Sequence, residues 1–186
     1  MTPILISNVK SRLKRFAGDT RGYLTVEAVI MFPILFWAML SMLVFFDAYR
    51  QNSLNVKAAF TISDMLSREV DPINAAYLDG AVNLFEELSR SDLDPRMRVT
   101  VVRYSDAHKR FFRDWSHQRG GVPVLTNADV LAMQNRLPNV PDNERLIIVE
   151  TWSDYNPPFN VGIKRQYLYN FVFTRPRFAP QVKFET

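Results

Sequence analysis

The chain has 186 residues, 47% of them hydrophobic, which is enough for one modest domain plus an anchor but not for two separate cores. It contains no cysteine, which excludes disulfides, thiolate metal sites and cysteine nucleophiles. The net charge of +4 comes from the first 22 residues, which carry five basic side chains and one acidic one, while the remainder carries 18 of each. Because a nucleic-acid binder needs basic residues on its folded domain, we exclude that class of partner and interpret the basic excess as a topology signal.

The apolar run from Ala28 to Phe46 contains 19 residues without a charge. As a helix it would be about 28 Å long, close to the thickness of the hydrocarbon core of a bilayer. We therefore predict a transmembrane helix over residues 23–46. Its basic flank is N-terminal, so the positive-inside rule places residues 1–22 in the cytoplasm and residues 47–186 on the outer side of the membrane.

A cleaved secretory signal peptide is the alternative, since it also combines a basic start with an apolar stretch. Its apolar region is usually shorter and ends at a small-residue Ala-x-Ala-like site. Residues 44–49 read Val-Phe-Phe-Asp-Ala-Tyr and do not match such a site. We therefore favour a retained anchor.

A single carboxylate, Glu27, lies at the head of this apolar run, five residues after Gly22. A charge near the hydrocarbon is costly, so an acidic residue in this position indicates a function. The alternative is that Glu27 reaches the headgroup region and does nothing specific.

The basic leader, Gly22, Glu27 and the early Pro33 together resemble the processing site and hydrophobic helix of prepilin-like proteins. The closest resemblance is to the TadE/TadF pseudopilins of the tight-adherence (Flp, type IVc) pilus system, and it covers roughly residues 15–65. It implies that a prepilin peptidase cuts after Gly22, which makes Tyr23 the first residue and Glu27 the fifth. Gly18 would make Tyr23 the fifth residue, so only Gly22 fits. The resemblance also implies that Pro33 permits local unwinding when the helix leaves the membrane.

Cleavage after Gly22 would remove the basic leader and create an α-amino group on Tyr23. This positive charge could pair with the Glu27 carboxylate of a neighbouring subunit and set the stagger of packed helices. The partners implied by the resemblance are the prepilin peptidase, other pilins and pseudopilins, and the inner-membrane pilus assembly platform.

The sequence after the predicted transmembrane helix predicts an α+β, pilin-like domain over residues 47–186. Helical periodicity continues from Asp47 to Glu69, and Asp71-Pro72 resembles the start of a second helix that reaches about Leu88. A short helix capped by Thr126 or Asn127 is expected within residues 126–137. We also expect a small antiparallel sheet made of three strands: Met97–Ser105, Arg145–Ser153 and Gln166–Arg175.

Two aromatic segments allow alternative interpretations. In the last strand, Tyr167, Tyr169, Phe171 and Phe173 occupy one side, which we interpret as the core side of the sheet; the alternative is a ligand or partner surface. Residues 110–119 mix aromatic and charged side chains, and we interpret them as a charged surface turn rather than a binding edge.

No catalytic constellation is recognisable in the sequence. The two histidines, His108 and His117, are nine residues apart, and neither a metal-ligand motif, a phosphate loop nor a nucleophile elbow is present. We therefore expect no enzymatic activity, no cofactor and no metal. The main alternative to a pseudopilin is a single-span membrane-anchored sensor or scaffold with a ligand-binding periplasmic domain; a membrane-anchored enzyme is a third possibility.

Overall fold

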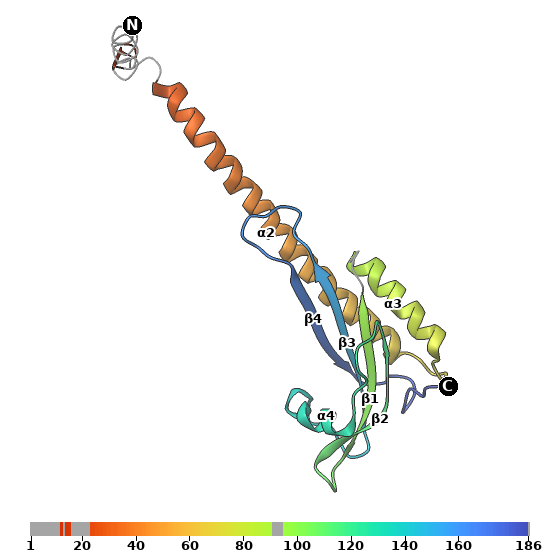
Figure 1. The fold of residues 1–186 in the computed structure, drawn as a ribbon. Helices are drawn as coiled ribbons and strands as arrows, with labels where there is room; N and C mark the ends of the chain where they lie inside the picture. Colours follow the sequence, from red (N-terminus) through yellow and green to blue (C-terminus); the bar gives the residue numbers. More distant parts are fainter. Residues whose placement is uncertain (1–11, 13, 16–22, 91–94, 186) are drawn as a thin grey trace. The chain divides into compact units, whose positions relative to one another are not determined.

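The computed structural model describes residues 12, 14–15, 23–90 and 95–185. The chain divides into two compact units, Met1–Phe45 and Phe46–Thr186. The described elements form an α+β fold with a long N-terminal apolar helix, a second long helix and a four-stranded antiparallel sheet (Figure 1). The predicted fold class is thereby confirmed.

The first described long helix, α2, spans Tyr23–Ser67 and is α-helical on both sides of Pro33. Its first half is almost uniformly apolar, and by length and composition α2 is a candidate to cross a membrane. Its last turn closes with short-range bonds, as the Arg68 N–H donates to the Met65 carbonyl (3.1 Å). No glycine interrupts the 45 residues, which favours one continuous element.

The second half of α2 and helix α3, Ala75–Ser89, pack on one face of the sheet, which we call the inner face. α3 contributes Phe85, which is fully buried, and burial of a side chain of this size contributes about 1.5–3 kcal/mol. The N-cap of α3 is Asn74, whose side chain accepts from the Tyr77 N–H. The predicted cap at Asp71-Pro72 is therefore wrong. The main chain of Ile73 instead pairs with residues 183 and 185, so the helix begins after it.

Three polar side chains recur every fourth residue along α2 and contact other elements of the unit Phe46–Thr186. Asp47 accepts a hydrogen bond from the Tyr155 hydroxyl (3.0 Å), and Asn55 Oδ1 accepts one from the Ser153 hydroxyl (2.5 Å). Between them, Gln51 Nε2 donates to the last carbonyl of α3 (2.7 Å). Burial and the bond to Asp47 raise the pKa of Tyr155 to about 12. These bonds satisfy polar groups that would be costly to bury unpaired.

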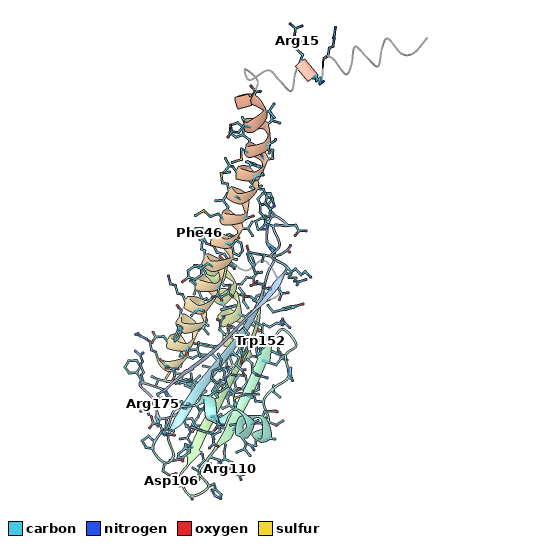
Figure 2. All side chains as sticks on the ribbon, turned by 90° about the vertical axis from the view of Figure 1, so that its left-hand side faces the viewer. Arg15, Phe46, Asp106, Arg110, Trp152 and Arg175 are labelled. Carbon is cyan, nitrogen blue, oxygen red and sulfur yellow. The ribbon has the colours of Figure 1, made fainter. Side chains whose placement is uncertain are left out.

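The sheet has the order β2-β1-β3-β4, and all neighbours are antiparallel. Its strands are β1 (Arg96–Ser105), β2 (Arg110–Arg119), β3 (Arg145–Tyr155) and β4 (Gln166–Thr174). The three predicted strands are present. The interpretation of residues 110–119 as a surface turn is wrong, because they form β2; the turn is shorter and lies between Asp106 and Arg110, which are labelled in Figure 2.

The opposite, outer face of the sheet is covered in part by helix α4, Asn127–Ala132, and the following 3-10 turn η2, Gln134–Arg136. α4 begins with the expected cap: Thr126 Oγ1 accepts from the Asp129 N–H, and the Asp129 carboxylate accepts from the Thr126 N–H (2.8 Å). Hydrogen bonds from Thr126 lower the pKa of Asp129. A second apolar cluster lies beneath these elements and includes Val102, Phe111, Val130, Leu146 and Ile148.

The aromatic row of β4 lies on the outer face, so its interpretation as the core side of the sheet is wrong. Tyr167, Tyr169 and Phe173 remain 70%, 42% and 41% exposed. The inner side of β4 carries Asn170 and Val172, both buried, and Asn170 Nδ2 donates to Thr151 Oγ1 (3.1 Å). Polar side chains from α2 and β3 line this part of the inner face. They can form hydrogen bonds with Asn170, which a row of aromatic rings on this side could not do.

Candidate functional site

The head of α2 carries three of the four residues singled out from the sequence. Tyr23 is the first residue of the helix, Glu27 lies one turn later and Pro33 lies within it. Gly22 and the basic leader lie outside the described residues. Tyr23 and Glu27 are four residues apart, so the helix places their Cα atoms on one face.

Glu27 is exposed, and its carboxylate makes no hydrogen bond or ion pair with any described residue. It is the only charged residue from position 23 to position 46. Its neighbours Val26, Ile30 and Met31 are also exposed, so the helix surface around the carboxylate is apolar. A carboxylate in such surroundings gains most from a cationic partner.

The outer face of the sheet holds a second group of polar residues, which sequence reasoning did not identify. Glu150 accepts hydrogen bonds from Arg98 Nε at 2.7 Å and from the Tyr169 hydroxyl at 2.7 Å, and Arg98 Nη1 donates to the Pro123 carbonyl at 2.6 Å. Burial and the hydrogen bond to Glu150 raise the pKa of Tyr169. β1 and β3 place Arg98 opposite Glu150, and each is the only charged residue in the buried stretch of its strand, 97–102 and 146–151.

Arginine side chains also lie over the aromatic rings of this face. The Arg136 guanidinium lies 3.9 Å from the centre of the Phe171 ring and 5.8 Å from that of Tyr169. Arg98 lies 5.2 Å from the centre of the Trp152 ring. Such contacts stabilise the cation and hold the rings in place. The result is a partly exposed aromatic surface on which Arg98 is paired with Glu150 and Arg136 lies over the rings.

The described residues contain no group of three or more His, Asp or Glu side chains that could hold a metal ion. His108 lies 3.1 Å from the Ser105 hydroxyl, while His117 is on β2 and stacks on Phe184, with 3.5 Å between ring centres. Burial lowers the pKa of His117, and the charge of Arg119 lowers it further.

Comparison of the chain with models of known protein families gives no match, and neither curated proteins nor solved structures match it. The resemblance to pseudopilins therefore rests on the residues of the chain itself.

Proposed function

We propose that this chain is a minor pseudopilin of the TadE/TadF type, which is processed by a prepilin peptidase and takes part in assembly of a tight-adherence (Flp, type IVc) pilus. The observation that carries the proposal is the Glu27 carboxylate, which has no partner among the described residues and is exposed among apolar side chains four residues from the start of α2. The α+β domain after the apolar helix is the layout expected for such a subunit.

Processing after Gly22 would hydrolyse one peptide bond and leave an ammonium group on Tyr23. This group would lie at the N-terminus of α2, where the helix dipole is also positive. The Glu27 carboxylate of an adjacent subunit would compensate the charge of the ammonium group and that of the dipole. In a poorly hydrated environment, the energy of attraction between two opposite charges depends strongly on the distance between them. The pair would therefore fix the axial offset between neighbouring helices.

In this proposal the subunit is inserted in the bacterial inner membrane with residues 1–22 in the cytoplasm and residues 47–186 outside. Its partners are the prepilin peptidase, other pilins and pseudopilins, and the assembly platform of the inner membrane. The protein performs no catalysis itself.

The test is the N-terminal sequence and intact mass of the full chain isolated from membranes, with and without a co-expressed prepilin peptidase. We expect Tyr23 as the first residue only when the peptidase is present. Gly22→Leu should block the cut, whereas the matched control Gly18→Leu should be processed normally. A chain that keeps Met1 in the presence of the active peptidase would refute the proposal and favour the sensor or scaffold alternative.

A further inference from the structure

Among the residues that the structure describes, one edge of strand β4 has no main-chain partner. It is the last strand of the sheet, and Figure 1 shows no further strand on the side of β4 that faces away from β3. Within residues 23–90 and 95–185, β3 is the only segment whose main chain bonds to that of β4. Unpaired N–H and C=O groups along a strand edge are a template for another strand.

The other edge of the sheet is protected. The main-chain N–H of Arg113 in β2 donates to the Asn127 side chain at 2.8 Å, and Trp115 Nε1 donates to the Val182 carbonyl at 2.8 Å. β2 also carries four charged residues, Arg110, Arg113, Asp114 and Arg119, and a bulge where its register with β1 shifts. Charges and bulges are common devices against edge pairing, and β4 has no charge and no proline.

The sequence of β4 is symmetric in residue type about Asn170. It reads Gln-Tyr-Leu-Tyr-Asn-Phe-Val-Phe-Thr, that is, polar, aromatic, aliphatic, aromatic, asparagine, aromatic, aliphatic, aromatic, polar. If two copies of β4 paired antiparallel about Asn170, Tyr169 would face Phe171 of the other copy and Tyr167 would face Phe173. Aromatic rings would meet rings on the outer side, and Leu168 would meet Val172 on the inner side.

We propose that two copies of this chain associate through antiparallel pairing of their β4 edges, around a two-fold axis at Asn170. Such an interface is isologous, so each of its contacts occurs twice. The nine residues of β4 give a paired length of about 30 Å. The four cross-strand aromatic pairs would add to the stability of the interface. The proposal does not depend on processing after Gly22.

The arginines at the two ends of β4 are each paired with a carboxylate of the same copy. Arg165 precedes the strand and pairs with Asp154, while Arg175 follows it and pairs with Glu144 (2.9 Å). Antiparallel pairing places the Arg165–Asp154 pair of one copy beside the Arg175–Glu144 pair of the other. Because each cation brings its own carboxylate, the strand ends meet without net repulsion.

The absence of cysteine allows a direct test in membranes that contain the full chain. Two differently tagged copies, one with Tyr167→Cys and one with Phe173→Cys, are co-expressed and oxidised, and cross-linked dimers are counted by tag. We expect the mixed pair to cross-link at least tenfold faster than either variant with itself. In the proposed register, position 167 of one copy lies about 20 Å along the strands from position 167 of the other, too far for a disulfide.

A second measurement uses variants without cysteine. Tyr167→Lys places a charge on the β4 edge and should reduce the dimer fraction of the detergent-solubilised chain at least fivefold, measured by mass photometry. Phe178→Lys is the matched control, because Phe178 is similarly exposed (67%) but lies outside β4; it should leave the dimer unchanged. Equal cross-linking of all combinations, cross-linking only between like positions, or no mixed cross-link with both variants folded would each overturn the proposal.

Discussion

Arg98 and Glu150 form a buried ion pair on the outer face of the sheet, with 2.6 Å between Nη2 and Oε2 and side chains only 10% and 2% exposed. The pair joins the two central strands, and Tyr169 extends it to β4. Three strands are therefore linked through one carboxylate.

Replacing Glu150 with alanine should destabilise the domain strongly. The substitution leaves the buried Arg98 guanidinium without its partner, and the free energy of unfolding should fall by about 3–5 kcal/mol. Urea unfolding of the full chain in detergent, followed by tryptophan fluorescence, measures this. Arg68→Ala, which removes a half-exposed ion pair with Asp64, is the control and should cost no more than about 1 kcal/mol. Equal effects of the two substitutions would contradict the expected role of burial.

The hydrogen bond between Asn55 and Ser153 should couple the stability effects of the two residues. Both side chains are buried, so Asn55→Ala and Ser153→Ala each leave one polar group unsatisfied, and the double variant removes both. A double-mutant cycle of unfolding free energies should give a coupling energy of about 1–2 kcal/mol. Strictly additive effects would show that the bond contributes nothing in solution.

His117 should make the stability of the domain depend on pH. Its pKa is lowered in the folded chain by burial and by Arg119, so the unfolded chain binds the proton more readily. Stability should therefore fall as the pH decreases through the ordinary histidine value of about 6.5, and level off below the lowered pKa of the folded state. His117→Phe keeps an aromatic ring against Phe184 and should remove the part of the pH dependence that comes from His117. The measurement is the difference in unfolding free energy between the two chains from pH 8 to pH 5; a constant difference would argue against it.

Substitution of Glu27 should separate processing from assembly. Glu27→Val removes the carboxylate but keeps the apolar helix surface, so we expect normal cleavage after Gly22 and loss of co-purification with partner pilins. Glu27→Asp retains the charge on a shorter side chain and should retain part of the interaction. Cleavage is measured by intact mass, and assembly by surface fibres in the native host. Wild-type fibre yield from Glu27→Val would refute the assembly role of the carboxylate.

Long periodic segments of this fold were predictable, and β2 was not. The apolar stretch of α2 and the alternation in β1, β3 and β4 are strong local signals. β2 reads Arg-Phe-Phe-Arg-Asp-Trp-Ser-His-Gln-Arg, and its bulge at Asp114 interrupts the period of two. The extra residue lets Asp114 accept from Arg145 (2.7 Å), a contact between distant residues that local pattern cannot reveal.

The orientation of β4 depended on its neighbours rather than on its own sequence. Both sides of the strand carry apolar residues, so hydrophobicity alone favoured burying the larger aromatic side. Asn170 is buried because Thr151 on β3 supplies a partner for it, and the aromatic side then turns outward. The Arg98–Glu150–Tyr169 network was missed for the same reason, since it forms only when three strands are aligned.

The polar contacts of Asp47, Gln51 and Asn55 have a mechanical consequence. They lie one turn apart, so sliding α2 by half a turn, about 2.7 Å, would break all three together. A force along the axis of this part of the helix would act on the three hydrogen bonds at the same time and not on one after another. Within residues 46–186, this part of α2 is thus held against axial displacement by three hydrogen bonds that act together.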